Sequence, residues 1–213
     1  MNERVIVTGT DTGIGKTVFA AALAARLDAA YWKPIQAGLQ GETDSDVVRR
    51  LGGLPAERIV REAYRLALPA SPHIAAAAEG VAIDPGKLQL PDTRHPLVIE
   101  GAGGLLVPLA PGLLQIDQFR TWGAPIILCA RTALGTINHT LLSLEALRVR
   151  RMAVLGVAFV GDCEAEVERT IVDLGAVRHL GRLPRIDPLD TATLRSVFDA
   201  SFACADMASW ACR

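Results

Sequence analysis

The sequence of 213 residues lacks the features that mark several large classes of protein. It has no apolar run of about 18 residues or more, and the short apolar segment at its start leads directly into a glycine-rich turn. We therefore expect neither a membrane span nor a signal peptide. The formal net charge is −1, without a lysine-rich tail or basic stripe, which makes nucleic acid a poor candidate for a partner. We expect a soluble protein of the cytoplasm.

Cysteine and aromatic residues are also scarce. The chain has four cysteines without a Cys-x-x-Cys pair, so their spacing predicts neither a zinc site nor a disulfide framework: Cys129, Cys163, Cys204 and Cys212. Aromatic residues make up 5% of the chain and hydrophobic residues 50%, with much alanine, valine and leucine. This balance suits small-residue helices packed on a buried sheet, and the length suits one domain over residues 1–213.

Apolar runs alternate with helical segments, which predicts an α/β fold with a mostly parallel sheet and helices on both faces. Five short runs rich in valine, isoleucine or leucine are predicted strands: Arg4–Gly9, Leu97–Glu100, Pro125–Ala130, Ala153–Phe159 and Val177–Leu180. Four segments are predicted helices: Val18–Leu27, Ile137–Arg148, Glu164–Leu174 and Thr193–Ala203. Prolines interrupt residues 34–96, where we expect short helices and loops and no second domain.

The most informative segment runs from Val5 to Thr17, where an apolar strand leads into a glycine-rich turn and then a helix. Backbone N–H groups around Gly13 and Gly15 are placed to bind phosphate oxygens, and Lys16 adds a positive charge. The threonine hydroxyl that follows is a Mg²⁺ ligand in loops of this kind. The loop is one residue longer than the common G-x-x-x-x-G-K-[ST] pattern. The alternative is a strand–turn–helix corner with a solvated lysine.

A second glycine-rich segment, Glu100-Gly101-Ala102-Gly103-Gly104, follows the predicted strand that begins at Leu97. Ligands of parallel α/β sheets bind outside the carboxyl ends of the strands, so this segment and the phosphate loop are expected to share one cleft. Glu100 is then a candidate Mg²⁺ ligand, because Mg²⁺ prefers oxygen ligands, and the glycines allow a close approach to phosphate. The alternative for Glu100 alone is a capped strand end with a flexible turn.

Three further charged residues each have a structural and a functional interpretation. Asp44 and Asp46 precede an amphipathic segment, so one of them is expected to cap a helix, and the alternative is a second carboxylate near Mg²⁺. Lys33 follows the extended pair Tyr31-Trp32 and precedes a proline, which keeps it out of the helical region. A lysine at a strand end can point into the cleft and offset the charge of phosphoryl transfer, whereas the alternative is an ordinary solvated lysine.

The segment Gly135-Thr136-Ile137-Asn138-His139 follows a predicted strand and opens a helix. Thr136 is the candidate N-cap residue, and N–H groups at a helix start can bind a carboxylate. His139 and His73 are better explained by structural hydrogen bonds than by catalysis.

These segments, in this order, resemble the dethiobiotin synthetase family of biotin biosynthesis. The resemblance runs from Arg4 to about Arg185 and rests on six blocks: Gly9-Thr10-Asp11-Thr12-Gly13-Ile14-Gly15-Lys16-Thr17, Lys33-Pro34 with Gly38, Ser45-Asp46, Ser71-Pro72-His73, Glu100-Gly101-Ala102-Gly103-Gly104 and Leu134-Gly135-Thr136-Ile137-Asn138-His139. The longer phosphate loop is the form found in this family. Any single block is weak, whereas the ordered set is highly specific.

The resemblance implies a P-loop α/β fold, a homodimer with substrate near the subunit interface, and a ligase reaction that uses ATP and Mg²⁺. An amine of 7,8-diaminopelargonate (7,8-diaminononanoate) takes up CO₂, supplied as CO₂ or bicarbonate, to form a carbamate. A carbamate oxygen then attacks the γ-phosphate of ATP to give a carbamic–phosphoric anhydride. The second amine displaces phosphate and closes the cyclic urea of dethiobiotin, leaving ADP. No protein nucleophile is needed, so positioning and charge are expected to carry the catalysis.

The same resemblance implies roles for individual residues. Thr17, Asp46 and Glu100 are implied as Mg²⁺ ligands, directly or through water, and the catalytic residues are Lys33, Lys16 and Thr12. Nucleotide contacts are implied for Gly13, Ile14, Gly15, Lys16, Thr17, Val18, Asp46, Glu100, Gly101, Ala102, Gly103, Val160, Gly161, Leu183, Pro184 and Arg185. Substrate contacts are implied for Thr12, Lys33, Ala37 and Pro72 and, across the dimer, for Gly135, Thr136, Ile137 and Asn138.

Two positions depart from the pattern of the family. Ala37 stands where many relatives carry serine, so a hydrogen bond to substrate is missing or made by backbone. Val160 and Gly161 lack the side-chain amide with which relatives read adenine, while Leu183-Pro184-Arg185 resembles the second base-binding turn. The sequence therefore predicts triphosphate binding with a weakened preference for adenine. Residues 186–213 match the family poorly, and no role is predicted for them.

Two other functions compete with this one. A nucleotide-gated switch would control a partner through its triphosphate state, but the chain lacks the Asn-Lys-x-Asp of guanine switches. It also has Thr10 and Asp11 where a partitioning-type ATPase carries a second lysine. A related amide-forming or cobyrinate-type ligase usually appends a glutamine-hydrolysing domain, for which 213 residues leave no room.

Overall fold

The computed structural model describes residues 3–202, which are built around a seven-stranded sheet in the order β11-β10-β9-β1-β6-β2-β4. The strands are β1 (Arg4–Gly9), β2 (Ala30–Trp32), β4 (Ile59–Val60), β6 (Leu97–Gly104), β9 (Ile126–Arg131), β10 (Val154–Val160) and β11 (His179–Leu183). All the pairings in this sheet are parallel, which confirms the predicted sheet type. The carboxyl ends of the strands therefore meet at one edge, and β1 lies at the centre.

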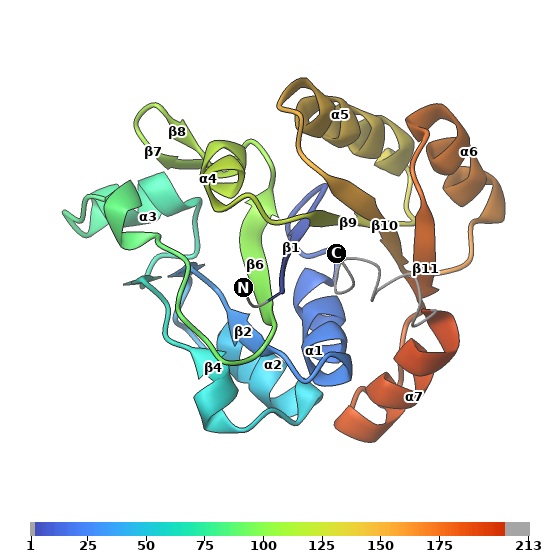
Figure 1. Ribbon diagram of the computed structural model, residues 1–213, viewed down its shortest axis with the longest axis horizontal. Coiled ribbons are helices and arrows are strands. Elements are labelled where there is room, and N and C mark those ends of the chain that lie inside the picture. The colour runs from blue at the N-terminus through green and yellow to red at the C-terminus, as the bar shows by residue number, and fades with distance from the viewer. Residues whose placement is uncertain (1–2, 203–213) are drawn as a thin grey trace.

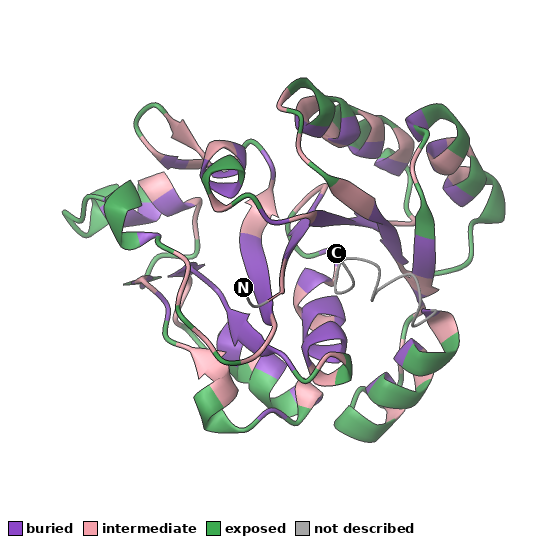
Figure 2. Ribbon diagram, in the orientation of Figure 1, coloured by how far each residue is buried: buried purple, intermediate pink, exposed green. Residues whose placement is uncertain are grey.

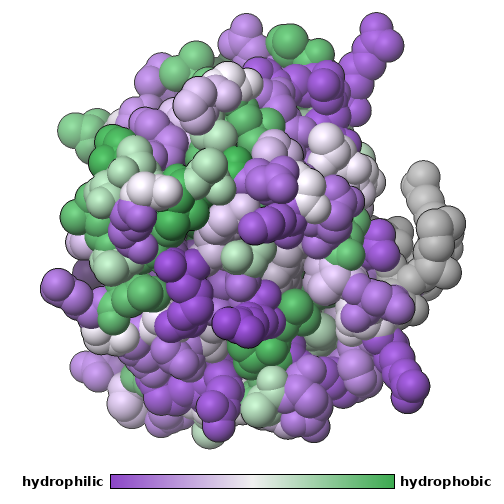
Figure 3. Space-filling view, turned by 90° about the vertical axis from the view of Figure 1, so that its left-hand side faces the viewer, coloured by the Kyte–Doolittle hydropathy of each residue, from purple (hydrophilic) through white to green (hydrophobic). Residues whose placement is uncertain are grey.

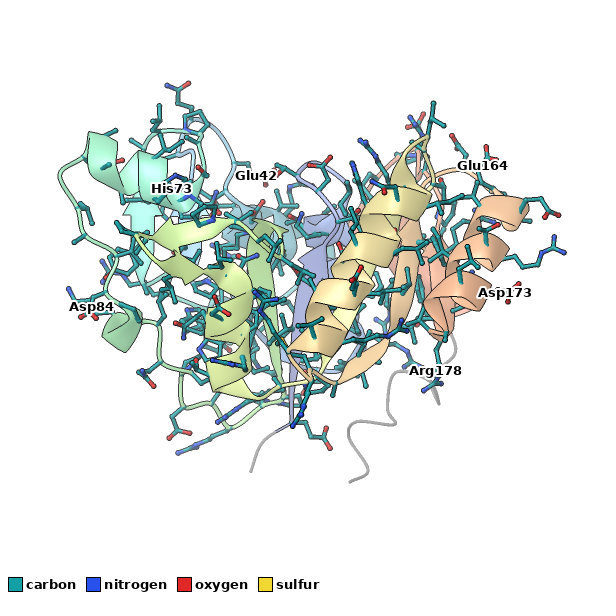
Figure 4. The ribbon with its side chains drawn as sticks, turned by 90° about the horizontal axis from the view of Figure 1, so that it is seen from above. Glu42, His73, Asp84, Glu164, Asp173 and Arg178 are labelled. Carbon is teal, nitrogen blue, oxygen red and sulfur yellow. The ribbon has the colours of Figure 1, made fainter. Side chains whose placement is uncertain are left out.

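Helices cover both faces of the sheet, as predicted (Figure 1). On one face lie α1 (Lys16–Arg26), α2 (Asp44–Gly52) and α7 (Thr191–Ser201). On the other lie α4 (Gln115–Trp122), α5 (Thr136–Val149) and α6 (Ala165–Gly175). Figure 4 views the molecule from above and places His73, on α3 (Pro72–Ala78), at one end and Glu164 and Asp173, around α6, at the other.

The central strands of the sheet are buried (Figure 2), and their side chains alternate between its two faces. Val5 and Val7 of β1 belong to the apolar cluster that includes α1, whereas Ile6 belongs to the cluster that includes α4. Phe19 of α1 is fully buried, and its ring packs on that of Phe198 in α7 with centroids 5.6 Å apart. Burying a phenylalanine contributes about 1.5–3 kcal/mol, so this contact helps to fix α1 beneath the sheet.

The predicted segments agree with the observed ones to within a few residues, but the sequence analysis missed several elements. It did not predict helix α4, and it did not include β2 and β4 among the strands of the sheet. Residues 34–96 include a small parallel pair that the sequence did not indicate, β3 (Ile35–Ala37) with β5 (Tyr64–Leu66), besides the short helices η1 (Ala56–Arg58) and η2 (Pro85–Lys87). A hairpin of β7 (Pro108–Ala110) and β8 (Leu113–Leu114) precedes α4. The strand predicted to end at Glu100 continues to Gly104. The predicted helix end Ala203 and the cysteines Cys204 and Cys212 lie outside the described residues.

The surface of the described part has apolar patches and no candidate membrane span. Within residues 3–202, no helix has both the length and the apolar character that crossing a bilayer requires. Figure 3 views the side on which α3 and the β7–β8 hairpin project, and hydrophobic side chains gather there in patches between hydrophilic ones. A groove of about 770 Å³ between α3 and this hairpin is lined mainly by apolar residues.

Candidate active site

The loop between β1 and α1 has the shape of an anion-binding nest. Gly13 and Gly15 have φ angles of 70° and 87°, a left-handed conformation that glycine adopts without strain. Gly15 is the N-cap residue of α1 and no side chain caps this helix start, so N–H groups of the first turn are left for a phosphate. The Lys16 ammonium bends back over the loop and donates to the Asp11 carbonyl oxygen at 2.6 Å.

Four polar side chains from separate parts of the chain meet beside this loop. Thr17 Oγ1 of α1 lies 3.1 Å from Asp44 Oδ1 of α2 and 2.9 Å from Glu100 Oε1 of β6. Lys33 Nζ lies 2.7 Å from Asp44 Oδ2 and 3.1 Å from Glu100 Oε1. It also donates to the Gly101 carbonyl oxygen at 3.1 Å. Lys33 and Glu100 are 4% and 1% exposed, so the alternative of a solvated lysine is wrong.

The structure turns the two aspartates in different directions. The sequence assigned the metal role to Asp46, but its Oδ2 accepts hydrogen bonds from Thr43 N at 3.0 Å and Thr43 Oγ1 at 2.6 Å. The Asp46 N–H donates to Thr43 Oγ1 at 3.3 Å, which completes a capping box at the start of α2, and the hydrogen bonds from Thr43 lower the pKa of the Asp46 carboxyl. Asp44, one position into the helix, faces Thr17 and Lys33 instead. The spacing Thr43-x-x-Asp46 is the sequence signal that separates the capping residue from the site residue.

Burial and charge act in opposite directions on the site's ionisable groups. Burial alone would lower the pKa of Lys33, but Glu100 and Asp44 raise it above its usual value, so this lysine is charged. Burial would raise the pKa of Asp44, but the Lys33 charge and hydrogen bonds from Lys33 and Thr17 lower it, so Asp44 is ionised at neutral pH. Burial dominates at Lys16 and lowers its pKa, although Glu100 opposes the shift. The site therefore combines two lysines with two acidic side chains.

The glycine-rich segment after Glu100 lies against the phosphate loop. Glu100 was expected at the end of a strand. Instead, β6 continues to Gly104, which pairs with Gly9 of β1. Gly103 has a φ of 63°, and a Cβ atom there would lie 2.9 Å from Thr12 Oγ1, so the close approach requires glycine. The prediction that the two glycine-rich segments share one cleft is confirmed.

That cleft has a volume of about 390 Å³. Its lining includes four residues that the sequence assigned to substrate: Thr12, Lys33, Ala37 and Pro72. It also includes Gln36, which the sequence analysis did not single out, and whose Oε1 accepts from the Asp44 backbone N–H at 3.3 Å. No sequence motif identifies Gln36, because its contact with Asp44 depends on where the start of α2 lies in the folded protein. His73 is not part of this lining, and its Nδ1 lies 3.2 Å from Ser71 Oγ, as a structural hydrogen bond would require.

The start of α5 is exposed, but its cap differs from the prediction. The N-cap residue is Gly135, with a φ of 91°, and no side chain caps the helix. Thr136 is the first helical residue and is 1% exposed, with its Oγ1 3.4 Å from Thr140 Oγ1. A buried threonine of the first turn cannot fold back as a cap. Asn138 is exposed, and the residues of this helix start do not line the 390 Å³ cleft of their own chain.

The residues predicted to face the base lie beyond the phosphate loop. Val160 ends β10 against it, since a Cβ atom on Gly15 would lie 2.7 Å from Val160 Cγ1. Gly161 has a φ of 126°, and its N–H donates to the Leu183 carbonyl oxygen at 2.9 Å. Val160 pairs with Leu183, so Val160, Gly161, Leu183, Pro184 and Arg185 form one border at the carboxyl ends of β10 and β11.

Comparison with known proteins gives full-length relatives of one kind. The family model for the AAA domain matches residues 3–193. An ATP-dependent dethiobiotin synthetase BioD of Rhodopseudomonas palustris (strain BisB5) is 63% identical over 206 residues, covering 97% of each chain. The chain belongs to the ATP-dependent dethiobiotin synthetase family. Its relatives of that name in Nitrobacter hamburgensis and Rhizorhabdus wittichii are 59% and 60% identical, over 97% and 98% of this chain and 97% and 100% of theirs.

Solved structures of P-loop ATPases share the fold of this dethiobiotin synthetase family member. A ParA family ATPase from Chlorobium tepidum TLS superimposes with a TM-score of 0.57 at 11% identity, over 93% of this chain and 92% of that one. The septum site-determining protein MinD from Pyrococcus horikoshii OT3, complexed with Mg-ADP, gives a TM-score of 0.54 at 17% identity, over 92% and 86%. The predicted fold class and family resemblance are both confirmed.

Proposed function

We propose that this chain closes the cyclic urea of dethiobiotin from 7,8-diaminopelargonate and CO₂, using ATP and Mg²⁺ and releasing ADP and phosphate. The observation that carries the proposal is the identity of 63%, over nearly the whole chain, with an ATP-dependent dethiobiotin synthetase. The alternative of a nucleotide-gated switch is not favoured, because ParA and MinD proteins resemble the chain in fold alone. The enzyme is a cyclo-ligase of biotin biosynthesis.

The oxygen atoms beside the phosphate loop fit a magnesium ion. Asp44 Oδ1 and Glu100 Oε1 both lie within hydrogen-bonding distance of Thr17 Oγ1, and hydroxyl and carboxylate oxygens are the ligands that Mg²⁺ prefers. We assign these three residues to the metal, with Asp44 in place of Asp46. When bound, the ion would neutralise charge on the triphosphate. The protein holds the ligands from three separate elements, which fixes the place of the γ-phosphate relative to the cleft.

Lys33 is placed to bring two anions together. Its buried ammonium contacts Asp44 and Glu100, and Lys33 and Asp44 both line the cleft in which the carbamate would bind next to the γ-phosphate. Carbamate and triphosphate repel each other, and a fixed positive charge between them offsets that repulsion as the phosphoryl group transfers. Lys16 and the N–H groups of residues 13–18 grip the phosphates, and Thr12 borders both the loop and the cleft. Ala102 and Gly103 line the same cleft.

We further propose a homodimer in which the start of α5 serves the partner's site. The Thr136 N–H donates to the Ala133 carbonyl oxygen at 3.1 Å, which leaves the N–H groups of Ile137 and Asn138 for the carboxylate of the diamine, yet this helix start does not border its own chain's cleft. Leu134 and Leu142 are 101% and 56% exposed, so this surface offers apolar area for a subunit contact. A cytoplasmic location fits an enzyme that draws on ATP.

The experiment that tests the function is incubation of the purified protein with diaminopelargonate, bicarbonate, Mg²⁺ and ATP, followed by mass spectrometry. A cyclic urea formed in equal amount to ADP is the expected result. A switch protein would instead hydrolyse ATP at the same rate without the diamine, and no urea would form.

A further inference from the structure

One buried hydroxyl at the site has no part in the proposed reaction. Tyr31 of β2 is 0% exposed, and its side chain belongs to the core cluster that contains α1 and α2. Its hydroxyl donates to Glu100 Oε2 at 2.8 Å. β2 pairs with β6 in parallel with Tyr31 opposite Val98, so the phenol reaches along the sheet to the acidic residue.

The two oxygens of Glu100 therefore have separate partners. Oε1 faces the site, with Thr17 at 2.9 Å and Lys33 at 3.1 Å, whereas Oε2 faces the core and receives the tyrosine hydrogen bond. An ionised carboxylate can only accept hydrogen bonds, so in this contact the Tyr31 phenol is the donor and Glu100 Oε2 the acceptor. The donor of this hydrogen bond thus lies in the core, and its acceptor belongs to the site.

We propose that Tyr31 is a positioning residue that fixes the Glu100 carboxylate with Oε1 turned toward the metal ligand Thr17. The inference rests on the proposed metal role of Glu100. Groups that hydrogen-bond a ligating carboxylate set its orientation, and removing them weakens metal affinity by about 10-fold to 100-fold. Without the phenol, Oε2 would be a buried oxygen without this donor, and the carboxylate would be free to rotate so that Oε1 leaves Thr17.

The test is Tyr31→Phe, which removes a single oxygen and keeps the ring in the core. The chain offers a matched control in Tyr64→Phe, because Tyr64 is also buried and its hydroxyl accepts from the Asp84 N–H at 2.8 Å, outside the site. Mg²⁺ is titrated against the binding of a fluorescent ADP analogue, which needs no turnover. Binding of the same analogue in EDTA and thermal unfolding are measured beside it.

The expected result is an apparent Mg²⁺ affinity lowered about 10-fold to 100-fold in Tyr31→Phe and unchanged in Tyr64→Phe, with metal-free nucleotide binding unaltered in both. A purely structural role would lower the melting temperature without moving the Mg²⁺ titration, and that outcome overturns the inference. The variant Glu100→Gln distinguishes a failure of the positioning role of Tyr31 from a failure of the metal role of Glu100. If it weakens Mg²⁺ binding and Tyr31→Phe does not, only the positioning role fails. If neither variant moves the titration, the metal role of Glu100 fails as well.

Discussion

Lys33→Met removes the positive charge between the acidic pair while keeping most of the apolar stem. Breaking a buried ion pair from one side costs about 3–5 kcal/mol. The side chain of Glu100 is 1% exposed but that of Asp44 is 32% exposed, so water relieves part of the loss. We expect the lower end, about 3 kcal/mol, which for a chain of this length lowers the melting temperature by about 6–12 °C.

The same change should remove ring closure without removing the nucleotide. Loss of one preorganised charge or donor at a developing anion costs about 10²–10³ in kcat, so dethiobiotin formation should fall at least that far. ATP binding should persist, because the phosphate loop and Lys16 are untouched. The assay is mass spectrometry of the urea beside calorimetric unfolding. Lys87→Met, an exposed lysine of η2, is the control. Turnover or a melting temperature like the wild type's in Lys33→Met would refute the charge argument.

The directions of the two pKa shifts predict how the stability loss in Lys33→Met depends on pH. The lowered pKa of Asp44 contributes stability that is present above its unfolded value, about 3.9, and is lost as the pH falls through its folded value. The raised pKa of Lys33 contributes stability that is lost only as the pH rises through its folded value, above the usual range for lysine. The stability gap between wild type and Lys33→Met should therefore be constant near neutral pH. It should narrow toward pH 4 and below, as Asp44 takes up a proton in the variant.

Three further predictions concern the metal and the base. Asp44→Asn should raise the Mg²⁺ requirement, whereas Asp46→Asn should cost about 1 kcal/mol of stability through its cap and leave metal dependence unchanged; the reverse pattern would restore the sequence assignment. Glu100→Gln should also raise the Mg²⁺ requirement, and an unaltered Mg²⁺ titration would remove this residue from the site. Turnover with ATP, CTP and GTP should differ by less than about 100-fold, near 2.8 kcal/mol, because the border from Val160 to Gly161 has no side-chain amide; a larger ATP preference would mean that other groups read the base.

Local patterns predicted the phosphate loop and the main strands and helices. The strand Arg4–Gly9 is observed with the predicted bounds, because a continuous apolar run before a glycine turn has few other solutions. The nest at Gly13 and Gly15 followed from the same local reasoning. These features depend on residues that are close in sequence, so one chain suffices to recognise them.

Features that depend on distant contacts were harder to predict. Both aspartates of residues 44–46 could cap a helix or face a metal, and the direction in which α2 points decides between them. Glu100 was placed at a strand end because pairing of Gly104 with Gly9 is not visible in a glycine-rich sequence. Likewise, the hydroxyl of Tyr31 reaches Glu100 only because β2 and β6 are neighbours in the sheet.

The proposed reaction requires the site to hold a CO₂-loaded amine in line with the γ-phosphate, so that a carbamate oxygen attacks phosphorus. The direct measurement uses ¹⁸O-labelled bicarbonate in unlabelled water, with quenching before the label exchanges. When the second amine closes the ring, the bond between the carbonyl carbon and the bridging oxygen breaks, and that oxygen leaves with the phosphate. Each phosphate released from labelled carbamate should therefore carry one ¹⁸O atom. Unlabelled phosphate formed together with dethiobiotin would contradict the proposed reaction.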